Sequence, residues 1–221
     1  MNQTVITDSL EARLAELPPP QAPAFPFPWD GLEEHLAEQQ EAWLRLVGYG
    51  SLLKKASADR TIKEGGTQRT PCIAFGCRRV FNYGMPEAVL KRYSILQSSP
   101  YKAALNVVAT GDFHDVMNGV LITVNVANIP ALKQREFGYD LVPAYCLPWI
   151  NPEQSPFTTA YVLCAPDIAP KPEHQVTDST ILPVPAYALL CEEGAAEVSP
   201  EFLEMYLNTT YLSDKVTLWK Q

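Results

Sequence analysis

The feature of the sequence that most constrains its fold is a series of strand-like segments with few helices between them. The segments are rich in β-branched and aromatic residues, are bounded by Gly, Pro, Asp and Asn, and span residues 70–83, 101–110, 118–126, 139–149 and 158–166. Successive parallel strands would each need a long crossover connection, usually a helix, and the chain offers few. The order of elements therefore predicts an α+β fold with a small mixed, mostly antiparallel β-barrel and flanking helices.

The N-terminal part of the chain is marked by a proline-rich segment, PPPQAPAFPFP, at residues 18–28. Proline fixes φ and lacks an amide donor, so proline at this density excludes a helix interior or a central strand. We predict an extended tether with Phe25 and Phe27 lying against the folded domain, a mobile arm being the alternative. Residues 1–43 are accordingly expected to form an N-terminal arm with a tether and a helix, and residues 44–221 the main domain.

Helix signals lie on both sides of the strand-like segments. Asp30, with Glu33 in the capping-box position, predicts a helix over residues 31–43. The sequence Ser57-Ala58-Asp59 offers a cap for a brief helical turn. Near the C-terminus, helices are expected at residues 187–197 and from a Ser199-Pro200 cap to about residue 207, after a proline-punctuated loop near 166–185.

A glycine-rich loop, GYGSL at residues 48–52, follows a short strand expected at Leu44–Gly48. Gly48 and Gly50 permit positive φ and close approach, so that consecutive amides can point into one concavity that holds a carboxylate or an oxyanion. An ordinary tight turn is the alternative. The loop lacks the third glycine of a dinucleotide fingerprint and the Gly-Lys-Ser/Thr ending of a P-loop, so a phosphate cofactor is not indicated.

Glu136 is expected in the last turn of a helix that is capped by Asn128 and terminated by Gly138. The negative end of a helix dipole raises the pKa of a carboxylate there. Phe137 and the apolar residues after it predict that this helix end enters the core, which would desolvate the carboxylate. Beside Arg135, the alternative is an ordinary solvated surface residue.

Three further side chains are weaker candidates. Ser51 could be a nucleophile, but the G-x-S-x-G elbow is absent and the hydrolase reaction would need a partner such as His114. Tyr139 could reach the Glu136 carboxylate or a substrate through its hydroxyl, or be a core tyrosine. Arg79 could pair with a carboxylate, and a surface ion pair is the simpler expectation.

Composition excludes several classes of partner. A formal net charge of -8 argues against nucleic acid, which binds clustered Lys and Arg. No apolar run approaches the ~20 residues that cross a bilayer, and the start resembles no signal peptide, so we expect a soluble cytoplasmic protein without a membrane partner. Five cysteines without a C-x-x-C pair and three widely separated histidines predict no metal site. The oligomeric state is not indicated.

Taken together, several segments resemble the gamma-glutamylcyclotransferase-like family in order and spacing. They are GYGSL after a short apolar strand, FGCRRVFN (75–82), NGVLITVN (118–125) and LKQREFGYDLV (132–142), and the tail at 191–212 looks like the closing helices of that family. The resemblance spans about residues 45–212. Leu52 stands where one branch of the family has asparagine. In having leucine there, the loop looks similar to the glutathione-acting branch, whereas the strands and tail look less like that branch. Phe137 separates a glutamate and a glycine that some members have adjacent.

The resemblance implies a function and a site. Tyr49, Gly50, Ser51 and Leu52 would hold the glutamyl part of a substrate through backbone amides, and Glu136 would be the catalytic acid-base. The reaction would convert a gamma-glutamyl amine or amino acid into 5-oxoproline and would need no cofactor. The leaving amine or amino acid stays open. The alternatives are a non-catalytic metabolite-binding module on the same fold and, less favoured, a serine hydrolase.

Overall fold

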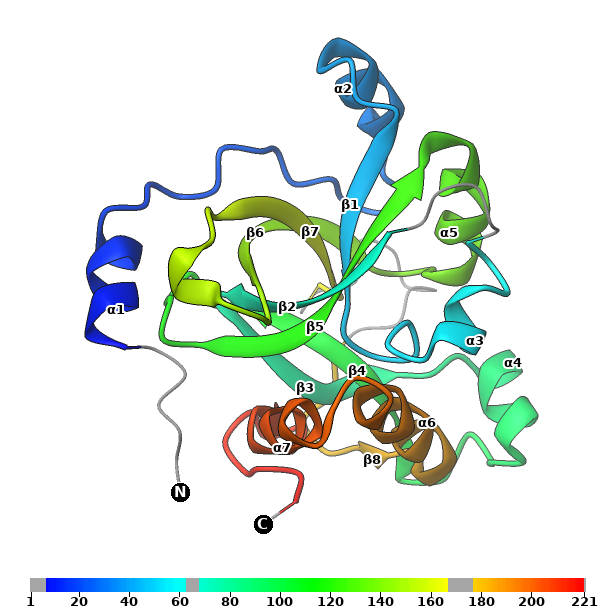
Figure 1. Ribbon diagram of the computed structural model, residues 1–221. Helices are drawn as coiled ribbons and strands as arrows, with labels where there is room; N and C mark the ends of the chain where they lie inside the picture. Colours follow the sequence, from blue (N-terminus) through cyan, green and yellow to red (C-terminus); the bar gives the residue numbers. More distant parts are fainter. Residues whose placement is uncertain (1–6, 63–67, 167–176, 221) are drawn as a thin grey trace.

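A closed five-stranded barrel forms the centre of the computed structural model, which describes residues 7–62, 68–166 and 177–220. Its strands are β1 (Trp43–Gly48), β2 (Arg69–Phe75), β5 (Val116–Asn125), β6 (Asp140–Pro148) and β7 (Thr158–Cys164), in the order β1-β5-β2-β6-β7 (Figure 1). Neighbouring strands are antiparallel except β1 and β7, which run parallel and close the barrel. The predicted mixed, mostly antiparallel barrel in an α+β fold is confirmed.

A second, four-stranded sheet lies beside the barrel in the order β8-β4-β3-β9. It consists of β3 (Cys77–Gly84), β4 (Tyr101–Ala109) and the short strands β8 (Leu182–Pro183) and β9 (Thr210–Tyr211). Helices α6 (Pro185–Ala196) and α7 (Pro200–Asn208) lie next to β3 and β4 (Figure 1). Ser199 caps α7 as expected, because its side chain accepts a hydrogen bond from the Phe202 amide.

The single strand expected at residues 70–83 is two strands. Gly76 has a φ of 72°, in the left-handed region that glycine adopts readily, and the chain turns there from β2 in the barrel to β3 in the second sheet. The residues on both sides are equally strand-like, so composition gave no sign of the break. A glycine inside a strand pattern signals a bulge or a bend, and here it is the bend.

The N-terminal helices differ from the expectation. Helix α1 (Asp8–Ala15) was not expected, and α2 is Leu32–Glu38 rather than 31–43. Gly31, with a φ of 82° and no side-chain cap, precedes α2 in place of an Asp30 cap. The helix ends early because Trp43 already pairs with Asn125 in the barrel.

The proline-rich segment follows the barrel surface. Phe25 is 6% exposed and exchanges two backbone hydrogen bonds with Leu141, of 2.8 and 2.9 Å. Phe27 packs edge-on against Phe137 of the main domain, with ring centroids 5.1 Å apart. The expectation that both phenylalanines lie against the domain is therefore confirmed.

The remaining helices are short. They are α3 (Lys55–Ala58), α4 (Glu87–Leu90), α5 (Ile129–Arg135) and the 3-10 turns η1 (Lys91–Tyr93), η2 (Val126–Asn128) and η3 (Pro152–Gln154). Ser57 lies inside α3 and does not cap it, since Lys54 holds the N-cap position. Asn128 precedes α5 as expected but makes no capping hydrogen bond through its side chain. Of the loop expected near 166–185, residues 167–176 lie outside the described residues.

Arg79 is fully buried, which contradicts the expected surface ion pair. Its guanidinium donates to oxygens of Asn118, Tyr206, Thr209 and Thr210 at 2.6–3.1 Å and lies 3.9 Å from the Tyr206 ring. Burial lowers the Arg79 pKa to about 10, so the group stays charged at neutral pH. It joins β3, β5 and the end of α7. Each helix in the described part of the chain is too short or too polar to cross a bilayer.

We expect Arg79→Met to lower the free energy of unfolding by roughly 3 kcal/mol or more, because it leaves several buried oxygens without a donor. The matched control is Arg78→Met, since Arg78 makes a partly exposed ion pair with Asp115 at 2.7 Å. Its cost should be about 1 kcal/mol or less. Urea denaturation of both variants checks this, and equal costs would contradict the structural role given to Arg79.

Candidate active site

The sequence-predicted site residues line one pocket. The loop residues Tyr49, Gly50, Ser51 and Leu52 follow the end of β1, and Glu136 follows the end of α5. The pocket is completed by Leu105 of β4, Leu163 of β7, Tyr187 of α6, and Tyr139. Two segments about 85 residues apart in sequence, as their numbers show, are thus brought together.

The loop offers backbone donors to a ligand. In the part of the chain that the structure describes, the amides of residues 49–52 have no hydrogen-bond partner. Neither Gly48 nor Gly50 has a positive φ, so that part of the expectation is wrong. Glycine is needed at position 50 for close approach, because a Cβ there would lie 2.7 Å from the Tyr187 hydroxyl oxygen.

Glu136 is a nearly buried carboxylate, with 12% of its side chain exposed. Helix α5 ends at Arg135, and Glu136 is the C-cap residue, whose amide donates to the Leu132 carbonyl. Burial raises the Glu136 pKa above its usual value, and the neighbouring Arg135 guanidinium opposes that rise. Desolvation is therefore the largest cause of the raised pKa. Phe137 does not enter the core as expected, since it is 45% exposed.

Arg135 connects the carboxylate to the loop. Its Nε donates to Glu136 Oε1 at 2.9 Å, and its Nη2 donates to Ser51 Oγ at 3.0 Å. Its Nη1 donates to the Ser57 carbonyl oxygen at 2.6 Å, which ties the group to α3. In the sequence, the neighbouring Arg135 favoured a solvated surface position for Glu136. No local pattern indicated that the Arg135 side chain would point inward.

Three tyrosines line the pocket, and their hydroxyl groups are neutral. Tyr49 donates to the Leu163 carbonyl, and Tyr139 donates to the Leu105 carbonyl at 2.8 Å. Burial raises the pKa of Tyr49, Tyr139 and Tyr187 well above the usual value, so none is a base at neutral pH. Tyr139 lines the pocket, yet its hydroxyl is bound to a backbone oxygen rather than to Glu136. Tyr187 was not singled out from the sequence.

The arrangement gives little support to a serine nucleophile. Ser51 Oγ accepts from Arg135, and none of the described residues that line the pocket is a histidine. His114 is largely exposed, with Nε2 3.9 Å from a carboxylate oxygen of Glu11. His35 packs against Phe25, and His174 lies outside the described residues.

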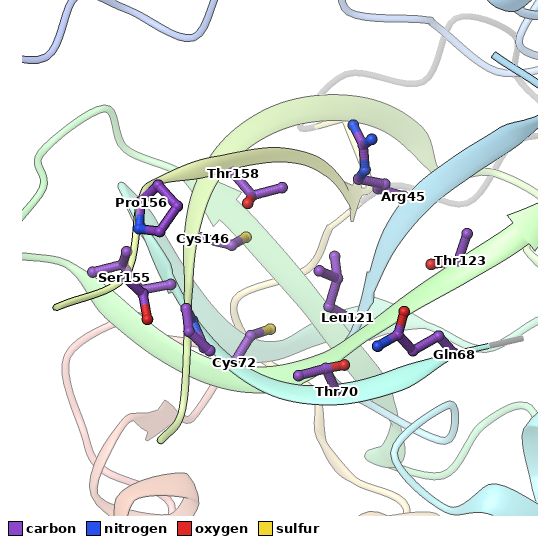
Figure 2. Close-up of a pocket in the computed structure, with 12 residues that line it drawn as sticks. Arg45, Gln68, Thr70, Cys72, Leu121, Thr123, Cys146, Ser155, Pro156 and Thr158 are labelled. Carbon is purple, nitrogen blue, oxygen red and sulfur yellow. The ribbon is translucent and has the colours of Figure 1, made fainter. Parts of the chain in front are cut away.

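The pocket has almost no free volume, and a larger cavity lies inside the barrel. Its free volume is about 20 Å³, room for about one water molecule. The barrel lumen has about 350 Å³ and is lined from all five barrel strands; Figure 2 shows Cys72, Cys146 and several threonines around it, with Arg45 at the rim. Of the described residues that line the lumen, only Arg45 is charged, and it lies 3.5 Å from Glu41. The described lining of the lumen therefore contains no carboxylate and no histidine.

Chemically, the smaller pocket can move a proton and bind an anion. A carboxylate whose pKa is raised by burial is a stronger base than an ordinary glutamate and can accept and return a proton. Unpaired backbone amides beside it suit a carboxylate or a developing oxyanion. Among the residues that the structure describes, no cluster of His, Cys, Asp or Glu has the composition of a metal site.

Comparison with known proteins shows the fold. No protein-family model matches the sequence, and no curated protein matches it significantly. A solved structure named gamma-glutamyl cyclotransferase is similar, with a TM-score of 0.53 and 13% identity over 74% of this chain and 86% of that chain. YkqA from Bacillus subtilis has a TM-score of 0.52 and 16% identity over 78% of this chain and 55% of that chain. The fold that the sequence resemblance implied is thus confirmed.

Removing the Arg135 charge should raise the Glu136 pKa further, because the guanidinium stabilises the ionised carboxylate and desolvation would then act unopposed. We expect this of Arg135→Gln in a carbon-13 NMR titration of the Glu136 carboxyl group. The matched control is Lys133→Gln on the same helix, since the Lys133 ammonium lies 3.8 Å from Glu33 instead. An unchanged or lower Glu136 pKa in Arg135→Gln would contradict the electrostatic role of Arg135.

A methyl group at position 50 should be tolerated only when the Tyr187 hydroxyl is removed. Gly50→Ala places a carbon 2.7 Å from that oxygen, and overpacking of this kind costs about 1–3 kcal/mol. We expect the double variant Gly50→Ala with Tyr187→Phe to recover most of the lost stability in urea denaturation. Additive losses in the double variant would show that this contact is not what requires glycine.

Proposed function

We propose that this chain is a cyclotransferase that converts a gamma-glutamyl amine or gamma-glutamyl amino acid into 5-oxoproline and a free amine or amino acid. The observation that carries the proposal is that one pocket is lined both by the buried Glu136 carboxylate and by the loop of residues 49–52, whose amides have no hydrogen-bond partner among the described residues. The likeness in fold to a gamma-glutamyl cyclotransferase supports it.

The reaction needs a base and a fixed substrate conformation. A gamma-glutamyl amide carries its α-amine and its γ-carbonyl in one molecule, so folding it toward a five-membered ring brings nucleophile and electrophile together at high effective concentration. In the proposed mechanism Glu136 takes a proton from the α-ammonium group, and the amine attacks the γ-carbonyl carbon. The carbon–nitrogen bond to the leaving group then breaks, and the Glu136 carboxyl group gives the proton to the departing amine. The new ring nitrogen gives up its remaining extra proton to this amine, which leaves as an ammonium ion, and Glu136 is again a carboxylate.

The neighbouring groups would support these steps. The amides of residues 49–52 would bind the α-carboxylate of the substrate or the oxyanion that forms at the γ-carbonyl. Arg135 would favour the ionised form of Glu136 and hold Ser51 beside it. Because the free volume of the pocket is smaller than a glutamyl group, the side chains that line it must move apart when a substrate binds.

We assign this activity to residues 44–221 and treat residues 1–43 as an appended arm. A cytoplasmic location is part of the proposal, because all five cysteines are free and buried, which fits a reducing compartment. The partner is a small gamma-glutamyl molecule.

A second candidate function is a non-catalytic module that binds a metabolite on the same fold. The nearly closed pocket, with Glu136 paired to Arg135, is the observation that favours it. Such a module would bind a gamma-glutamyl compound without releasing 5-oxoproline, so a turnover assay separates the two functions.

We expect the wild-type protein to release 5-oxoproline from at least one member of a panel of gamma-glutamyl amines and amino acids, as measured by mass spectrometry. Glu136→Gln should lower kcat by about 10²–10⁴-fold, the usual contribution of an acid-base group. The control Glu38→Gln makes the same change at an exposed position of α2 and should leave kcat unchanged. A folded Glu136→Gln variant with full activity would exclude Glu136 as the acid-base group.

A further inference from the structure

The segment Phe25–Trp29 of the N-terminal arm, which we call the strap, contacts the chain immediately after Glu136. The Trp29 indole nitrogen donates to the Tyr139 carbonyl at 2.8 Å. The Phe27 amide donates to Asp140 Oδ1 at 2.6 Å. Phe25 and Leu141 exchange two backbone hydrogen bonds. Three alternate residues of the strap, Phe25, Phe27 and Trp29, therefore bind three consecutive residues of the main domain. These are residues 139–141, which begin three positions after Glu136.

We infer that the strap is a positioning element for Glu136, which fixes the carboxylate relative to the loop of residues 49–52. For the role of Glu136, this inference rests on the proposed cyclotransferase function. No residue of the strap lines the candidate pocket, so the strap would act through the backbone of residues 137–141 and not on the substrate.

The strap is itself firmly held. Trp29 is fully buried and Phe25 nearly so, and the Phe25 ring packs against Tyr161 of β7 at 5.8 Å. The Phe27 ring packs edge-on against Phe137 at 5.1 Å, which adds a side-chain contact to the residue directly after Glu136. Helix α2, which follows the strap in the sequence, buries Leu32 and Leu36. A segment anchored in this way can restrain its neighbour.

The chain around Glu136 needs such a restraint. Helix α5 has 7 residues and ends just before Glu136, and Gly138 follows with a φ of 87°. A short helix followed by a glycine is weakly constrained by local structure. Other contacts to this stretch include the hydrogen bonds from the Tyr83 hydroxyl to the Phe137 carbonyl, from Arg135 to Glu136, and from the Tyr139 hydroxyl to the Leu105 carbonyl.

The electrostatic surroundings of Glu136 make a displacement measurable. The charged group that acts on its carboxylate is the Arg135 guanidinium, and the carboxylate in turn raises the pKa of the nearby hydroxyls of Tyr49, Tyr83, Tyr139 and Tyr187. Burial is the largest cause of its raised pKa. Loosening residues 137–141 would admit water, so the Glu136 pKa would fall toward its usual value.

The test uses two variants that remove strap contacts from opposite sides. Trp29→Phe keeps an aromatic ring and removes the donor to Tyr139, and Asp140→Ala removes the acceptor for the Phe27 amide. Trp149→Phe is the matched control, because this tryptophan packs on Phe202 beyond the far end of β6. Each full-length variant is examined by carbon-13 NMR titration of Glu136 and by the pH profile of kcat with a substrate that the wild type converts.

We expect both strap variants to fold, to lose about tenfold in kcat, and to keep KM within about twofold of the wild-type value. The Glu136 pKa and the acid limb of the kcat profile should both move to lower pH, whereas Trp149→Phe should change neither. A loss of global stability alone would leave the pKa of the folded protein unchanged. If Trp29→Phe does not fold, Asp140→Ala decides.

Wild-type values of kcat and of the Glu136 pKa in folded strap variants would overturn the inference while the proposed function stood. A wild-type protein that releases no 5-oxoproline would instead overturn the proposed function. The NMR titration needs no turnover, so in that case a lowered Glu136 pKa would still support positioning by the strap, and an unchanged one would overturn it.

Discussion

The candidate site depends on the parallel contact between β1 and β7 that closes the barrel. Leu46 pairs with Tyr161 in this contact, so the C-terminal ends of both strands reach the same edge. The loop of residues 49–52 leaves β1 at that edge, and Tyr49 donates to the carbonyl of Leu163 near the end of β7. Strand β6 runs antiparallel to β7 and begins there with Asp140 opposite Cys164, which brings Glu136 to the same place. An antiparallel closure would have put the loop at the other end of β7.

At this edge the nearly buried carboxylate of Glu136 is compensated by a neighbouring cation. Withdrawing a carboxylate from water is costly unless a partner compensates, and Arg135 is that partner for Glu136. The remaining guanidinium donors are satisfied by oxygens of Ser51, Ser57 and Thr61. The short helix α3 and the loop thus take part in setting the Glu136 pKa, although neither touches the carboxylate by a hydrogen bond. The balance between burial and this one cation leaves the pKa above its usual value.

Local patterns in the sequence predicted much of the fold, and contacts between distant residues could not be predicted in the same way. The barrel strands and the Ser199 cap follow from composition and turn residues within a few positions. The site pairing of Glu136 with the loop came from family resemblance. The inward turn of Arg135, the burial of Arg79 and the bond from Trp29 to Tyr139 each depend on residues many positions away. A single sequence holds no local signal for such contacts.

The larger cavity and the candidate catalytic residue Glu136 lie in different parts of the molecule, and strand register explains why. Alternating positions on adjacent strands place Thr70 opposite Leu121, Cys72 opposite Gly119, and Cys146 opposite Thr158. These inward residues are mostly small, so they leave the lumen of about 350 Å³ unfilled at the end of the barrel remote from the loop. At the other end, three tyrosines line the pocket beside Glu136 and leave a free volume of only about 20 Å³. The larger cavity has the volume, but its described lining contains no carboxylate and no histidine. The pKa of Glu136 is raised because the smaller pocket is closely packed around it. Because of the same close packing, a substrate can bind only if the pocket opens.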